Sequence, residues 1–181
     1  MSAIATSATY GAVEYFNVSW SGLPNGNTAS ATALIGIDTS AIPNPGSYSN
    51  ANTVPSWFQS ITLKITGASV GNGTFTLSDF SGVSWNTNGG TLDFNMQLVG
   101  QPTSGAPWGT TPGSPGSGDF NLFSSSGPAP SGTQFFELTT NAGFGDTMNL
   151  VSFAPVPEPG TYALLAAGCA GFLLLRRRAK S

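Results

Sequence analysis

Short runs in which apolar and polar residues alternate are the feature that most restricts the fold of this chain. Four of them are clear: Phe16–Trp20, Ile61–Thr66, Phe75–Ser78 and Leu92–Leu98. A period of two places the apolar side chains on one face of a β-strand and the polar ones on the other. Shorter or less regular candidates are Ala31–Ile37, Val83–Trp85, Phe120–Phe123, Thr133–Thr140 and Thr147–Phe153. Helical periodicity is missing before residue 160, so we expect an all-β domain.

Asn-Gly pairs separate several of these runs and predict tight turns, because both residue types tolerate positive φ. They occur at Asn25-Gly26, Asn72-Gly73 and Asn88-Gly89. Since Asn72-Gly73 joins two alternating runs, we expect a β-hairpin there. Roughly seven to nine short strands with one apolar face each must bury those faces against a second sheet. The expected fold is therefore a β-sandwich or a jelly-roll-like variant.

The charge pattern excludes some partners. Charged residues make up 7% of the 181-residue chain, whereas an ordinary soluble domain has about 25%. Residues 1–156 contain seven acids and a single base, Lys64, which gives a net charge of −6. Such a surface offers nothing to a phosphate backbone, so we expect no nucleic-acid partner. Because 39% of the residues are hydrophobic, the chain is not intrinsically disordered either.

Few side chains are available for catalysis. The sequence has no histidine, and its single cysteine is Cys169. A Ser-His-Asp triad, a Cys-His pair and a His-ligated metal site are therefore impossible, and we expect neither an enzyme nor a cofactor. Paired carboxylates for glycoside cleavage are the remaining option, with Glu14 and Glu137 as candidates, but we predict solvated acids instead. Cys169 is expected to pack in an apolar segment rather than to be acylated.

Two further patterns are candidate binding sites. Asp93-Phe94-Asn95 and Asp119-Phe120-Asn121 repeat one tripeptide, which would place two oxygen-bearing side chains on one strand face and would suit calcium. The polar face of a strand explains the same spacing, so we predict no metal site. Trp20 and Trp85 flank apolar runs and are expected in the core. Trp57 and Trp108 lie among Pro, Ser and Gly, and are expected to be exposed, where their rings could stack on sugars.

The end of the chain departs from the alternating pattern. The prolines of Val156–Gly160 cannot donate ladder hydrogen bonds and keep the preceding residues extended. An uncharged run, Tyr162–Leu175, follows. The chain then has a basic end, formed by Arg176, Arg177, Arg178 and Lys180. As a helix the run is short for a hydrocarbon core of ~30 Å, but it has no polar face, and cations suit the cytoplasmic membrane surface. We expect one C-terminal transmembrane helix.

Three parts of the tail, taken in this order, resemble a PEP-CTERM sorting signal. They are the segment Val156, Pro157, Glu158, Pro159, then the apolar run, and then the arginine cluster. The resemblance covers about residues 156–180 and departs from the family at Gly160, where Ser or Thr is common. It implies that an exosortase-like membrane enzyme of exopolysaccharide-producing Gram-negative bacteria processes the tail. It also implies transient residence in the inner membrane, and then the cell surface or extracellular matrix. Glu158 would be the side chain that the enzyme reads.

We therefore divide the chain into an N-terminal end (1–9), a β-sandwich domain (10–154) and a sorting tail (155–181). The tail consists of a recognition segment (156–160), an apolar helix (161–175) and a basic end (176–180). Ala3-Ile4-Ala5 fits a signal-peptidase site, which favours a signal peptide encoded upstream of Met1; small residues in a flexible end are the alternative.

The expected function is a non-enzymatic, structural protein of the cell surface or matrix. The alternative is a carbohydrate-binding module associated with exopolysaccharide, in which Trp57 and Trp108 would stack on the sugar.

Overall fold

The computed structural model describes residues 13–69, 71–110, 119–124 and 146–157. Its strands are β1 (Val13–Ser21), β2 (Ser30–Asp38), β3 (Ser47–Asn50), β4 (Phe58–Thr66), β5 (Gly73–Thr76), β6 (Phe80–Asn86), β7 (Phe120–Ser124) and β8 (Asn149–Pro155). Two 3-10 turns, η1 (Leu23–Asn25) and η2 (Leu77–Asp79), complete the regular structure of these residues. The prediction of an all-β domain is confirmed for these residues.

No helix within the described ranges is long and apolar enough to cross a membrane. The transmembrane helix predicted at residues 161–175 lies outside those ranges, as does the candidate strand Thr133–Thr140.

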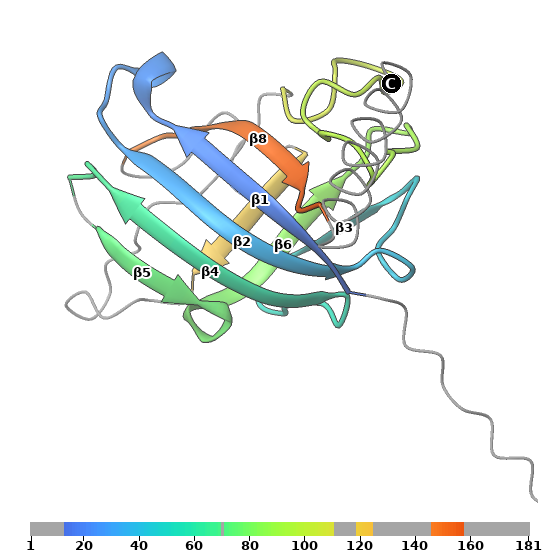
Figure 1. Ribbon diagram of the computed structural model, residues 1–181, viewed down its shortest axis with the longest axis horizontal. Coiled ribbons are helices and arrows are strands. Elements are labelled where there is room, and N and C mark those ends of the chain that lie inside the picture. Colours follow the sequence, from blue (N-terminus) through green and yellow to red (C-terminus); the bar gives the residue numbers. More distant parts are fainter. Residues whose placement is uncertain (1–12, 70, 111–118, 125–145, 158–181) are drawn as a thin grey trace, which may run out of the picture.

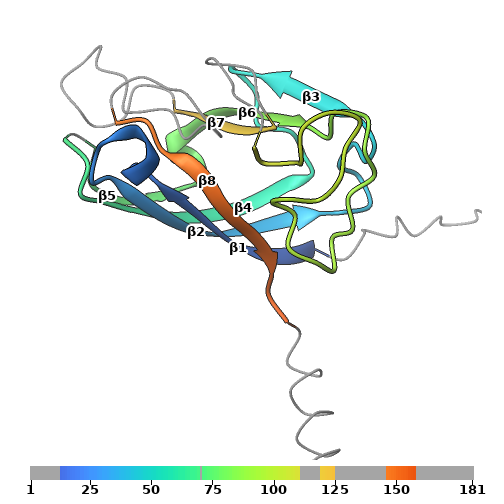
Figure 2. The ribbon, with the colours of Figure 1, turned by 90° about the horizontal axis from the view of Figure 1, so that it is seen from above.

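The strands of the described residues form two antiparallel sheets (Figure 1). One has the order β5-β4-β2-β1-β8, and the other has the order β3-β6-β7. Figure 2 shows them as two layers. β1 pairs with β2 along its full length, from Val13 opposite Asp38 to Ser21 opposite Ser30. On its other side β1 pairs with β8, so the first and last described strands are neighbours.

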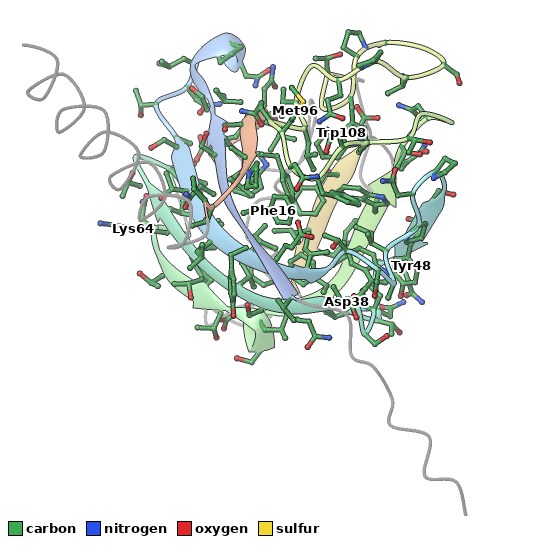
Figure 3. All side chains as sticks on the ribbon, turned by 45° about the vertical axis from the view of Figure 1, so that its right-hand side comes forward. Phe16, Asp38, Tyr48, Lys64, Met96 and Trp108 are labelled. Carbon is green, nitrogen blue, oxygen red and sulfur yellow. The ribbon has the colours of Figure 1, made fainter. Side chains whose placement is uncertain are left out.

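The core lies between the two sheets and is rich in aromatic rings. Phe16, Val18 and Trp20 of β1 are at most 2% exposed, as the alternating pattern predicts. Trp85 of β6 has its ring centroid within 6.3 Å of the rings of Trp57, Trp108, Phe94, Phe120 and Phe153. Figure 3 shows Phe16 and Trp108 between the layers, whereas Lys64 points away from them.

Most sequence-predicted strands are present within the described ranges. The predicted hairpin is confirmed, because β4 and β5 pair with Thr62 opposite Thr76. Strand β3 was not predicted, because its Ser-Tyr-Ser-Asn sequence has no apolar alternation. The run Phe75–Ser78 is only partly a strand, because β5 ends at Thr76 and the side chain of Asp79 caps η2.

The strand predicted at Leu92–Leu98 is wrong. The carboxylate of Asp93 accepts the backbone N–H of Asn95 at 3.0 Å, and the carbonyl of Asp93 accepts the N–H of Met96 at 3.2 Å. These bonds close a turn, a conformation that Asp favours over an extended one. Leu92 and Leu98 are nevertheless buried, so the apolar positions were identified correctly and the backbone conformation was not.

Residues 87–110, here called the irregular segment, cover one end of the core without forming a strand. Side chains supply part of the pairing that a sheet would provide, beside backbone bonds such as those of Trp108 with Gly100 and Gln101 at 2.8 Å. Asn44 donates to the carbonyl of Leu92 at 2.7 Å and accepts the Leu92 N–H at 2.8 Å. Gln101 makes the same double contact with the backbone of Asp93, at 2.8 and 2.9 Å. The segment is thus fixed in part by a few specific amides.

Candidate functional site

The candidate site is the place where β8 ends and the tail begins. β8 is an edge strand of the five-stranded sheet. Its pairing with β1 runs to Pro155 opposite Phe16. One more bond follows, from the N–H of Val156 to the carbonyl of Tyr15 at 2.7 Å. Pro157 has no N–H, so the ladder cannot continue. The predicted recognition segment therefore starts at the last hydrogen bond of the sheet, with no intervening linker.

The strand before this point is held from its other side as well. Phe153 donates its N–H to the side-chain oxygen of Gln97 at 2.6 Å, and its carbonyl accepts the N–H of Leu98 at 2.9 Å. Gln97 also donates to the hydroxyl of Ser152 at 2.7 Å. The irregular segment thereby pairs with an edge that would otherwise be open to another chain.

The ring of Phe153 anchors β8 in the core. It is fully buried, and its centroid lies 5.2 Å from the rings of both Phe16 and Phe120. A bulge opposite Ser19 and Trp20 leaves Val151 53% exposed and keeps Phe153 facing inward. Because β8 is fixed on both edges and by its side chain, the tail leaves the domain from a rigid position.

The structure describes only part of the predicted sorting motif. Val156 and Pro157 are exposed beyond the end of β8, where a processing enzyme can reach them. Glu158 and Pro159 lie outside the described residues. The same is true of the predicted membrane stop, namely Arg176, Arg177, Arg178 and Lys180.

The expectation that Trp57 and Trp108 are exposed is wrong. Trp57 is 5% exposed and Trp108 is fully buried, with its ring 5.0 Å from that of Trp85. The indole N–H of Trp108 donates to the carbonyl of Asn86 at 2.9 Å. Polar neighbours in the sequence suggested exposure, but the irregular segment folds back so that Trp108 enters the core. Neither ring can stack on a sugar, whereas Trp20 and Trp85 lie in the core as predicted.

The repeated Asp-Phe-Asn tripeptides have different structural roles. Asp93 is exposed and caps the turn described above. Asp119 is fully buried at the start of β7, where its carboxylate accepts the N–H of Gly109 at 2.7 Å and a hydrogen bond from the Asn88 amide. Within the described ranges, no three or more His, Cys, Asp or Glu side chains are grouped as metal ligands.

The other carboxylates contact separate hydroxyl groups. Glu14 accepts a hydrogen bond from Thr39 at 2.8 Å, and Asp38 accepts one from Ser40 at 2.6 Å. Asp146 accepts the hydroxyl of Ser69 at 2.6 Å and also its N–H, and these two bonds lower the pKa of the Asp146 carboxyl. Glu137, the second predicted carboxylate of a catalytic pair, lies outside the described residues.

The fold and the chain exit together define an all-β domain that continues directly into a C-terminal tail. Residues 155–178 of that tail match the family model of the PEP-CTERM protein-sorting motif. The chain therefore carries a PEP-CTERM sorting signal, which implies export and processing at a membrane by an exosortase-like enzyme. A search of the curated proteins and one of the solved structures give no match. The matched segment begins at Pro155, so it includes the last residue of β8.

Proposed function

We propose that the described domain is the exported part of a non-enzymatic, structural protein of the cell surface or extracellular matrix. Its architecture would be a β-sandwich, because two antiparallel sheets lie in two layers around one aromatic core. Before processing, residues 161–175 would anchor the protein in the inner membrane. Exopolysaccharide is a further proposed partner of the mature protein.

The hydrogen bond from Val156 to Tyr15 is the observation that carries this proposal. It fixes the start of the recognition segment on a rigid strand, and a proline favours extended geometry in the residue before it, so the sequence of residues 156–159 favours an extended peptide. An extended peptide can enter an enzyme cleft without first unfolding. The non-enzymatic role is supported by the described carboxylates, since Glu14, Asp38 and Asp146 each contact a different hydroxyl group.

Mass spectrometry of the mature protein in a host that has an exosortase tests the proposal. In the wild type, the cell-surface form should lack residues Arg176–Lys180. Glu158→Gln removes the only charge of the recognition segment, so we expect the full-length chain to accumulate in the inner membrane. Glu158→Asp keeps the charge and should retain partial processing. A wild-type surface form that still carries the basic end would mean an ordinary tail anchor and would overturn the sorting role.

The basic end is tested separately. Changing Arg176, Arg177 and Arg178 together to Ala removes the proposed membrane stop. We expect the tail to slip through the membrane, so that the protein is released with its tail attached. Retention of this variant in the inner membrane at the wild-type level would show that the cations do not act as a stop.

A further inference from the structure

Three exposed apolar side chains surround the point where the tail leaves the sheet. Val13, Tyr15 and Val156 are 37%, 49% and 37% exposed. The register that pairs Phe16 with Pro155 places Val156 opposite Tyr15, on the outer face of the five-stranded sheet. Val13 shares this face, because residues two apart in a strand point the same way. We call these three side chains the exit patch.

Gly36 makes the exit patch continuous. It lies opposite Tyr15 on β2 and has no side chain. A Cβ atom at Gly36 would lie 2.5 Å from the hydroxyl of Ser60, and 3.2 Å from both the Tyr15 ring and a methyl group of Val13. The side chains of Tyr15 and Val13 therefore both lie over this backbone position. A larger residue at 36 would push them apart.

The remainder of this outer face is mostly polar. Its exposed positions are mainly hydroxyl and amide side chains, namely Asn17, Ser30, Thr32, Thr62, Thr66, Thr74 and Thr76, together with Lys64. Leu34 of β2 and Val151 of β8, 44% and 53% exposed, are the large apolar exceptions. Single exposed apolar residues are ordinary on a protein surface. The exit patch differs because its members are contiguous and adjoin the tail.

The length of the tail limits how far the exit patch can lie from a membrane. Five residues, and so six Cα–Cα steps, separate Val156 from Tyr162, where the uncharged run begins. A fully extended chain covers at most ~3.5 Å per residue, so this connection spans about 20 Å or less. The headgroup layer itself is ~5–8 Å thick on each side of the hydrocarbon. With the apolar run inserted, this end of the sheet is held close to the headgroups.

The chemistry of the patch fits the surface of a bilayer. Tyrosine is enriched at membrane interfaces, where its ring contacts the acyl chains and its hydroxyl stays in water. The nearby charge is acidic: Asp38 lies opposite Val13, at the end of the sheet seen in Figure 3. The basic residue Lys64 lies farther from the patch, because its partner Thr32 is four residues along β2 from Gly36. The patch should therefore prefer zwitterionic over anionic headgroups.

We propose that the exit patch is a lipid-contact surface that seats this end of the sheet on the headgroup layer while the tail is inserted. This inference rests on the proposed membrane insertion of residues 161–175. Its consequence is mechanical: it fixes the height and tilt of the domain, and so the position of Pro157 and the following residues relative to a membrane-embedded enzyme.

Site-specific fluorescence on the full-length chain tests the proposal. Cys169→Ser removes the single native cysteine, so that an environment-sensitive dye can be attached at Tyr15→Cys. The matched control is Leu23→Cys, which is 75% exposed at the opposite end of β1. Both proteins are reconstituted in phosphatidylcholine vesicles that contain a headgroup-linked quencher. We expect several-fold stronger quenching at position 15 than at position 23, reduced when phosphatidylglycerol is added.

Flotation of the vesicles separates the two ways in which the experiment can fail. A chain that floats with the vesicles but is quenched equally at 15 and 23 overturns the lipid contact and leaves the anchor intact. A chain that does not float overturns the membrane insertion on which both depend. Quenching at position 15 that appears only when an exosortase is also reconstituted would mean a protein contact, and would also overturn the proposal.

A second pair of variants avoids labelling. Val13→Ser combined with Tyr15→Ser removes the apolar character of the patch, whereas Leu23→Ser removes a more exposed apolar residue elsewhere. Thermal unfolding should verify that both proteins fold. In a host with an exosortase, we expect the double variant to be processed several-fold more slowly than wild type and Leu23→Ser to be unchanged. Equal processing of all three proteins would overturn a role for the patch in sorting.

Discussion

The five-stranded sheet and the irregular segment both bury tryptophan, but they support it in different ways. Trp20, 2% exposed, lies on β1 between two paired strands. Trp108 is fully buried in a segment without strand pairing. There the backbone–backbone bonds are scattered, such as those of Trp108 with Gly100 and Gln101 at 2.8 Å. Side chains supplement them: Asn44 bonds Leu92, Gln101 bonds Asp93 and Asp119 bonds Gly109.

The difference concerns redundancy. A strand in the middle of a sheet has a long ladder, so the loss of one bond leaves many others. The irregular segment has only scattered backbone–backbone bonds, which single amides and one carboxylate supplement, so the loss of one of these side chains is less easily compensated. Regions held in this way open locally at lower free energy than the core strands. Because Gln97 and Leu98 also bond Phe153, such opening would reach β8 and the base of the tail.

The largest expected effect comes from Trp108→Ala. Removing a buried tryptophan costs ~3–5 kcal/mol of unfolding free energy, and here it also removes the anchor of the irregular segment. Trp20→Ala should cost a similar amount but leave the segment in place. Denaturant unfolding measures the cost, and amide hydrogen exchange locates it. Equal protection of residues 87–110 in the two variants would contradict the comparison.

Asn44→Ala should have the next largest effect. It leaves the N–H and the carbonyl of Leu92 without their partner, and unpaired buried backbone groups cost ~1–3 kcal/mol. Thr62→Val, on the exposed face of β4, is the control and should change stability by less than ~0.5 kcal/mol. Denaturant unfolding of both variants decides the matter. A loss below that of the control would show that the segment does not rely on this amide.

A milder pair of substitutions compares the two indole groups. Trp108→Phe removes the N–H that bonds the carbonyl of Asn86, whereas the Trp20 indole N–H is buried without a hydrogen-bond partner among the described residues. Trp108→Phe should therefore be more destabilising than Trp20→Phe by ~1 kcal/mol. Thermal or denaturant unfolding provides the measurement. The reverse order would mean that ring volume, rather than hydrogen bonding, dominates at both positions.

The smallest expected effect is pH-dependent. Hydrogen bonds from Ser69 lower the pKa of the Asp146 carboxyl below its ordinary 3.8. The stabilisation is therefore complete above the ordinary pKa and is lost as pH falls through the lower folded value. Ser69→Ala should slightly reduce stability at neutral pH, and the gap to wild type should close in acid. Denaturant unfolding at both pH values measures this gap, and a gap independent of pH would contradict the assignment.

The sequence predicted the sheet better than the irregular segment for a physical reason. Alternation in Phe16–Trp20 and Ile61–Thr66 reflects burial of one strand face, and β1 and β4 follow it. The same alternation in Leu92–Leu98 reflects burial too, but the Asp93 side chain diverts the backbone into a turn. The polar neighbours of Trp57 and Trp108 in the sequence also led to the wrong prediction that these two rings are exposed. Their burial depends on contacts with distant residues such as Trp85.

The candidate site was predictable only in part. Val156 and Pro157 were identified from the order of the tail residues, which needs no fold. The exit patch was missed, because it joins residues far apart in sequence. A signal was present in the sequence. Val13 and Tyr15 lie on the same strand face as the polar residues Asn17 and Ser19, yet they are apolar. Only the pairing of β1 with β8 brings Val156 beside them.

The adjacency of β1 and β8 also sets the order of events during secretion. A chain that crosses a membrane from its N-terminus delivers β1 first, yet Phe16 must wait for Pro155 before that side of the sheet closes. Pairings between such distant residues form slowly. Closure of the sheet would thus coincide with arrival of the sorting segment, so the peptide would reach its processing enzyme just as the domain behind it becomes rigid.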